Sequence, residues 1–205
     1  MHPNPAFRTR PREANAAFAR ERGFGMLAVN GADGPHLAHV PFLLSEDGTL
    51  LETHLVRSTP LARSLPAEGV MAVPGPDGYI SPDWYGLPEQ VPTWNYVAVH
   101  LRGPVEIAPP ETLRDLLDRQ SALFEDRLAP KPAWRTAKMP DAVMARLMRA
   151  ILPCRMRVET VEGTWKLGQN KPEAARHGAA EGLAASVLSP EARFLEALMR
   201  DLPDS

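Results

Sequence analysis

The 205-residue sequence lacks the features that mark several classes of protein. It has one cysteine, Cys154, so no disulfide can form within the chain. Acidic and basic residues are interspersed and give a formal charge of −2, without a basic block that could neutralise successive phosphates of a nucleic acid. No run approaches the roughly 20 apolar residues of a membrane span, and residues 1–23 lack the apolar centre of a secretory signal. We therefore expect a cytoplasmic protein that crosses no membrane and does not bind DNA directly.

A chain of this length can bury a sizeable apolar core within one domain. Turn signals at 31–34 and 46–48 indicate hairpins. Because no long helices separate the apolar runs of this region, they predict an antiparallel barrel rather than a doubly wound sheet. The runs are 25–29, 35–44, 49–56, 70–73 and 93–107.

Helical spacing surrounds the predicted barrel. Alternation over 154–161 predicts a final strand, in which we expect Cys154 to be a buried structural thiol. In the last predicted helix, Ser189 is the expected N-cap and Pro190 the first helical residue. The fold predicted is mainly β with peripheral helices (α+β), as one domain over 1–205 with a helical insertion around 110–151 and C-terminal helices within 172–202. The predicted helices are 11–22, 110–128, 141–151, 172–183 and 190–202.

Residues 53–63 combine a strand with a short helix and carry groups that bind anions. Thr59 stands at the N-cap position, followed by proline. A helix N-terminus offers unpaired N–H groups and partial positive charge, to which Arg57 and the hydroxyls of Ser58 and Thr59 add further donors. A terminal phosphate requires such groups. The alternative, which this segment alone leaves open, is an ordinary capped helix with solvated arginines.

The preceding hairpin determines which histidines share a face. If residues 47–48 form a two-residue loop, His54 lies opposite Pro41 and His39 opposite Val56. His39 and His54 are then diagonal neighbours on one face of the sheet. A three-residue loop would put them on opposite faces.

Four histidines, His36, His39, His54 and His100, raise the alternative of a metal site. His36 and His39 are three residues apart on a predicted strand, so they face opposite sides. The run also lacks the helical or cysteine-rich spacing of a zinc site. We predict no metal site.

Two segments, 79–96 and 162–171, concentrate aromatic rings, amides and ammonium groups. A buried core would not use such side chains without partners. Together the segments predict a pocket for a planar ligand with polar edges.

These segments belong to an ordered set of landmarks by which the chain resembles the PaiB-type family of FMN-binding negative transcriptional regulators. The resemblance runs nearly end to end, although Gly168 stands where the family is expected to have serine. It implies a split β-barrel related to pyridoxamine-phosphate oxidase and a homodimer with FMN sites at the subunit interface. The landmarks are 38–41, 54–60, 75–85, 91–96 and 165–171.

Carried over residue by residue, the resemblance implies an FMN site made from two groups of residues. The FMN phosphate would lie near the first group, which is His54, Arg57, Ser58 and Thr59, with His39 and Val40 on the adjoining strand. Trp94 and Asn95 would line the flavin or the dimer seam. Lys166, Gln169 and Asn170 would reach the ring or the phosphate, from the partner chain.

The resemblance implies a flavin-dependent regulator, and we expect it to act indirectly. The helix predicted at 141–151 carries Arg146 and Arg149, but its other face consists of apolar residues, as in a helix that packs against the protein core. The alternative is an FMN-dependent oxidoreductase with a nicotinamide donor and a small-molecule acceptor, which would need no catalytic side chain from the protein. An interaction module with a vestigial flavin site is a third reading. The sequence does not decide whether the chain is an enzyme.

Overall fold

The computed structural model describes residues 1–186 and 191–203, which form two compact units. The barrel unit consists of residues 16–73 and 101–161, and the terminal unit of residues 1–15, 74–100 and those from 162 onward. Two long strands, β4 (Ala67–Ile80) and β5 (Thr93–Ile107), contribute one part to each unit. None of the helices in the described ranges has the length and hydrophobicity of a membrane span.

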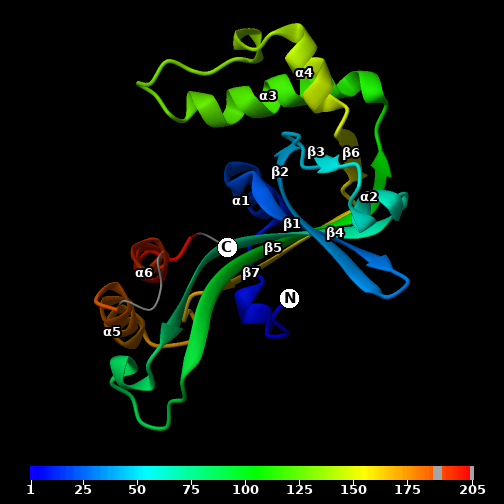
Figure 1. Cartoon of the computed structure of the whole chain (residues 1–205). Helices are drawn as coiled ribbons and strands as arrows, with labels where there is room; N and C mark the ends of the chain where they lie inside the picture. The colour runs from blue at the N-terminus through cyan, green and yellow to red at the C-terminus, as the bar shows by residue number, and fades with distance from the viewer. Residues whose placement is uncertain (187–190, 204–205) are drawn as a thin grey trace. The chain divides into compact units, whose positions relative to one another are not determined.

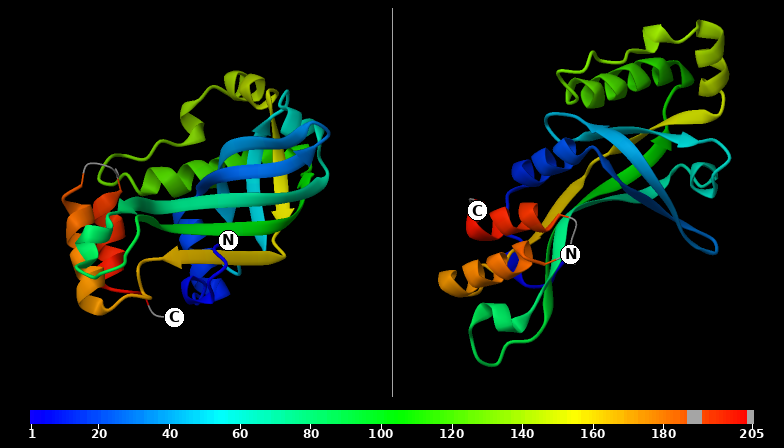
Figure 2. Two further views of the ribbon diagram at one scale, coloured as in Figure 1. Left: turned by 90° about the horizontal axis from the view of Figure 1, so that it is seen from below. Right: turned by 60° about the vertical axis from the view of Figure 1, so that its left-hand side comes forward.

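The strands of the barrel unit form one sheet that closes on itself (Figures 1 and 2). Their order is β4-β1-β2-β3-β6-β5, and β4 also pairs with β5. The neighbouring strands run antiparallel, so the predicted mainly β fold with an antiparallel barrel is confirmed. The strands besides β4 and β5 are β1 (Phe24–Gly31), β2 (Gly34–Leu44), β3 (Leu50–Val56) and β6 (Ile151–Arg157).

Alternation along each strand separates the core of the barrel from its outer surface. On β3, Leu51, Thr53 and Leu55 are buried, whereas the residues between them are half-buried. Cys154 on β6 is 1% exposed, as the sequence predicts. The barrel is therefore filled by side chains. Its largest fully buried side chains include Phe42, Leu27, Met71, Leu101 and Met156.

A tight turn between β2 and β3 sets the register of these two strands. The loop is longer than the predicted two residues, because Ser45 N–H donates to Leu50 O at 2.9 Å and encloses residues 46–49. Phe42 nevertheless lies opposite Thr53, which is the register predicted from the sequence. The longer loop adds one residue on each strand side, so the same residues of β2 and β3 stay opposite each other. The inner and outer faces are therefore those predicted.

The α-helices of the described chain are α1 to α6. α1 (Arg12–Arg22), α2 (Pro60–Arg63), α3 (Leu113–Asp126) and α4 (Asp141–Met148) match predicted helices. α3 is joined to the outer face of β3 by Arg119, whose Nη1 and Nη2 donate to the Glu52 carboxylate at 2.8 and 2.9 Å.

In the terminal unit, β5 pairs with β7 (Thr160–Lys166), and α5 (Glu173–Ala184) packs beside α6 (Ala192–Arg200) (Figure 1). α5 also packs on a short 3-10 helix, η2 (Pro82–Tyr85). A Cβ atom at Gly182 would collide with the Trp84 ring, so this approach requires glycine. The predicted N-cap Ser189 and Pro190 lie outside the described residues.

Two predicted strand boundaries are wrong. The sequence predicts a strand only at 70–73, but β4 continues through 74–80, where glycine and proline are typical of turns. A Cβ at Gly78 would lie 2.6 Å from Leu183 Cδ1, so a larger residue there would make this side chain shift. The strand predicted over 154–161 is in fact two strands, β6 and β7.

Replacing Phe42 with alanine should lower the free energy of unfolding by about 3–5 kcal/mol, because it opens a cavity in the barrel core. Urea denaturation measures this change. Phe24→Ala removes the same ring from a position that is 51% exposed and should cost far less. Equal losses for the two variants would contradict the assigned core.

Candidate functional site

The turn between β3 and α2 has the capping geometry predicted from the sequence. Thr59 is the N-cap, and its Oγ1 accepts from Ala62 N–H at 3.3 Å, with Pro60 at the first helical position. The same hydroxyl donates to Val56 O at 2.9 Å. Its proton is therefore used within the turn, and Thr59 fixes the turn rather than offering a free donor.

Arg57 is an exposed cation held in place by main-chain carbonyls of the barrel unit. Its Nε donates to Arg149 O at 3.1 Å and its Nη2 to Ile151 O at 3.3 Å. A guanidinium has five N–H donors, so three have no hydrogen-bond partner in the described part of the chain. Beside it, the exposed Ser58 supplies a hydroxyl, and its carbonyl accepts from Arg63 at 2.6 Å. An oriented cation next to a hydroxyl suits a phosphate monoester.

His54 lies on the outer face of β3, covered by α3. It forms a side-chain hydrogen bond with the buried Gln120. Within the described residues, however, two buried nitrogen atoms of this pair have no hydrogen-bond partner, His54 Nδ1 and Gln120 Nε2. Burial is the main cause of the lowered pKa of His54, opposed by the hydrogen bond to Gln120. The imidazole is therefore neutral near pH 7, with one ring nitrogen that an additional polar group could satisfy.

The two predicted residues on β2 face opposite ways. His39 is exposed on the outer face, which is also the face of His54 on β3. Val40 is 7% exposed and points into the core, so only its main chain is open to a ligand. Among residues 1–186 and 191–203, no group of three or more histidine, cysteine or acidic side chains could hold a metal ion.

The terminal unit contains a cavity of about 310 Å³ that includes three of the predicted site residues. Asn95 comes from β5, Lys166 from the end of β7, and Asn170 from the turn that follows. The full lining is Asn4, Phe7, Tyr85, Glu89, Gln90, Val91, Thr93, Asn95, Lys166, Gly168, Asn170 and Lys171.

Two ammonium groups face this cavity. Lys166 Nζ donates to Thr93 Oγ1 and, at 2.8 Å, to Trp94 O. Lys171 Nζ donates to Gln90 Oε1 and lies 5.3 Å from the centroid of the Tyr85 ring, a cation–π contact. The pKa of Lys166 is lowered, first by burial and then by the charge of Lys171. The cavity is therefore built around positive charge.

The aromatic residues of the predicted site have different surroundings. Trp94 is 50% exposed and meets Tyr79 edge to face, with ring centroids 6.5 Å apart. Trp165 is buried, and its indole Nε1 donates to Asn15 Oδ1 at 2.9 Å. Trp94 is available to a ligand, whereas Trp165 belongs to the packing of the terminal unit.

Gln169 uses its side-chain amide to fold its own turn. Its Oε1 accepts from Leu167 N–H at 2.8 Å, and its Nε2 donates to Trp165 O at 2.6 Å and to Ala6 O at 3.1 Å. This arrangement suits a residue that positions Lys166 and Asn170. Gly168 has φ +80°, a left-handed conformation that favours glycine over the serine expected from the resemblance.

Sequence reasoning missed Gln120, Thr93 and Lys171. Gln120 is a polar residue 5% exposed on α3, and its partner on β3 is 66 positions away in sequence. No local sequence pattern predicts that two residues so far apart will pair. Lys171 lies within the segment 162–171 that is predicted to border the pocket, and its spacing of five from Lys166 is the signal that could have singled it out.

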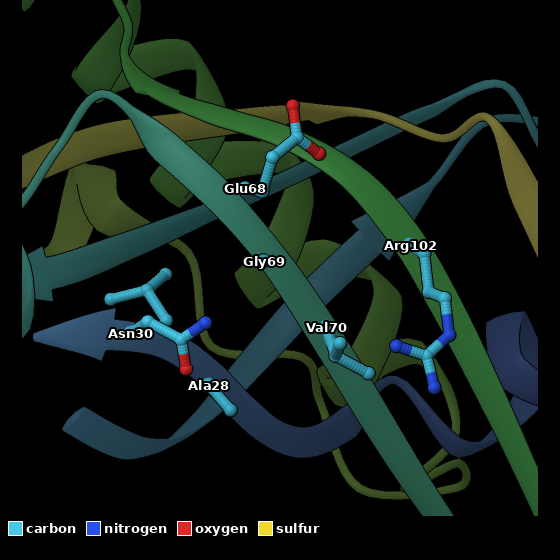
Figure 3. Close-up of a pocket in the computed structure, with 7 residues that line it drawn as sticks. Ala28, Asn30, Glu68, Gly69, Val70 and Arg102 are labelled. Atoms are coloured by element: carbon cyan, nitrogen blue, oxygen red, sulfur yellow. The ribbon is translucent and has the colours of Figure 1, made fainter. Parts of the chain in front are cut away.

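A second cavity, of about 270 Å³, lies over β1, β4 and β5 in the barrel unit (Figure 3). Main chain at Gly69 forms part of it, and Figure 3 shows Arg102 extending from β5 toward Val70. It carries one acidic and one basic side chain, Glu68 and Arg102.

Because its pKa is depressed, neutral His54 supports folding above pH 6.5, and this support is lost as pH falls through the folded-state value. Unfolding free energy should therefore fall on acidification, and His54→Gln should reduce that fall. Urea denaturation at several pH values between neutral and acidic measures the effect. His39→Gln, at an exposed position, should keep the wild-type pH dependence. If both variants keep it, His54 is not the group responsible.

Comparisons with known proteins identify the family to which the chain belongs. A family model described as "Putative FMN-binding domain" matches residues 1–160. The chain is 28% identical over 188 residues to "Protease synthase and sporulation protein PAI 2" of Bacillus subtilis, an alignment that covers 90% of this chain and 89% of that protein.

Solved structures share the fold. The FAD and heme binding protein of Mycobacterium smegmatis matches with a TM-score of 0.59 and 18% identity over 89% of this chain and 82% of that one. The flavocytochrome Anf3 of Azotobacter vinelandii matches with a TM-score of 0.55 and 16% identity over 80% and 72%. With the family model spanning 160 residues of this sequence, the chain belongs to the PaiB-type FMN-binding family.

Proposed function

We propose that the chain is an FMN-binding, PaiB-type regulatory protein that acts indirectly on gene expression, with all of residues 1–205 serving as one FMN-binding split-barrel domain. The family match supports the cofactor. The observation that carries the proposal is Arg57, whose exposed guanidinium is oriented by two carbonyls and keeps three N–H groups for an anion.

The FMN phosphate is assigned to the turn between β3 and α2. Arg57 and Ser58 donate to it, Thr59 holds the turn in shape, and His54 lies on the adjoining strand β3, where α3 covers its ring. His39 and the main chain of Val40 border the site from β2. Charge-assisted hydrogen bonds from an oriented guanidinium are among the stronger contacts available to a phosphate.

The flavin ring is assigned to residues of the terminal unit, supplied by the partner chain of a homodimer. Trp94 has an exposed indole for stacking, Asn170 supplies an exposed amide, and Lys166 supplies a cation. Asn95 is 1% exposed and its Nδ2 donates to Met199 Sδ, so it supports the wall of the cavity rather than offering its amide. Gln169 positions this turn. Bound FMN would supply the ability to accept and release electrons, and a cation near the ring favours its reduced, anionic form.

Indirect regulation is favoured by the described helices. α4 carries Arg146 and exposes Leu147 by 53% while burying Met144, which suits packing or protein contact better than insertion into a DNA groove. Rapid bleaching of bound FMN by NADH or NADPH, with turnover on an acceptor, would show that the protein is an oxidoreductase rather than an indirect regulator.

Arg57→Ala should weaken FMN binding roughly 10- to 150-fold, the effect of losing a charge-assisted contact of about 1.5–3 kcal/mol. Titration followed by flavin fluorescence gives the dissociation constant. Arg193→Ala, which removes an exposed arginine from α6, is the matched control and should bind FMN as the wild type does. An unchanged constant for Arg57→Ala would remove Arg57 from the site.

The protein should be a homodimer in solution, with twice the chain mass of 22.5 kDa by light scattering. Apolar side chains support this expectation, because Leu37, Val56 and Ile107 of the barrel unit are 43–54% exposed. A monomer that binds FMN normally would contradict the assignment of ring contacts to a partner chain.

A further inference from the structure

We propose that the cavity between Lys166 and Lys171 binds a small organic anion, a carboxylate or phosphate ester, in addition to FMN. The proposal that an anion binds is argued from the residues of the cavity alone. Its placement beside the flavin rests on the proposed function, which assigns Lys166 and Asn170 to the surroundings of the ring.

The use of lysine in this chain is selective. The sequence has 23 basic residues, of which only four are lysines: Lys131, Lys138, Lys166 and Lys171. Two of the four face one cavity, and their mutual repulsion contributes to the lowered pKa of Lys166. The acidic residue of the lining, Glu89, is exposed. Placing two ammonium groups together is unfavourable unless an anion joins them.

The ammonium groups retain hydrogen-bond capacity. Each has three N–H donors. Lys166 uses two, on Thr93 and on Trp94 O, and Lys171 uses one, on Gln90. Within the described part of the chain, three N–H donors therefore have no acceptor. The oxygen atoms of a carboxylate or phosphate can accept all three.

The remaining walls limit the size and character of the ligand. Phe7, Tyr85 and Val91 contribute apolar lining, while Asn170 adds an exposed amide. A volume of about 310 Å³ is at the lower end of the range for small-molecule sites, roughly 300–1,000 Å³. The cavity therefore suits a compact anion with an apolar part, not a polymer.

The test is calorimetric titration of FMN-free and FMN-loaded protein with sodium benzoate and, separately, with inorganic phosphate, at constant ionic strength. Saturable binding of either probe, one per chain, is expected in both forms. Lys171→Met should weaken it roughly tenfold or more, since a charge-assisted contact is lost. Lys138→Met removes an exposed lysine and should bind the probe as the wild type does.

Lys171→Gln is the second variant. It replaces the methionine variant if thermal denaturation shows that the methionine variant is not folded. It should show the same loss of affinity. Absence of saturable binding by both probes, or equal affinity in the Lys171 and Lys138 variants, overturns the proposal. Displacement of the probe by FMN also overturns it, because the cavity would then hold only the flavin, and the proposed function would stand. Probe binding by a protein that takes up no FMN supports the anion site and removes the proposed function.

Discussion

The Asp47 carboxylate in the turn between β2 and β3 fixes the register on which the barrel side of the site depends. Its Oδ1 accepts from the Thr49 N–H at 3.0 Å, from the Thr49 hydroxyl at 2.8 Å and from the Ser45 hydroxyl. These hydrogen bonds lower its pKa to about 2, so the turn keeps its acceptor throughout the ordinary pH range. A slip of one residue would turn His54 into the core and Thr53 out of it.

Hydrogen-bond accounting separates residues that build the site from residues that can meet a ligand. The Gln169 amide and the Thr59 hydroxyl proton are used on neighbouring main chain, and the Trp165 indole N–H on Asn15, so these side chains shape the molecule. Arg57, Lys166 and Lys171 are also anchored, but each is oriented by some of its donors and keeps others. A cation held in this way loses little conformational freedom when an anion arrives.

The sequence predicts what local patterns determine. Alternation and turn residues give the antiparallel barrel and the β2–β3 register, and the N-cap signal gives α2 beginning after Thr59. Glycine and proline are typical of turns, so the second half of β4 is not predicted. Its packing depends on a residue far along the chain, since Gly78 lies close to the side chain of Leu183. The pairing of His54 with α3 and the cavity shared by two lysines likewise depend on tertiary structure. The site residues that spacing alone could not select came from the resemblance to a family.

Whether this chain holds FMN is decided by the visible absorption spectrum of the purified protein, recorded before and after incubation with FMN and gel filtration. We expect a yellow protein that retains about one flavin per chain, with a spectrum shifted from that of the free cofactor. A colourless protein that releases all added FMN on the column would contradict this expectation.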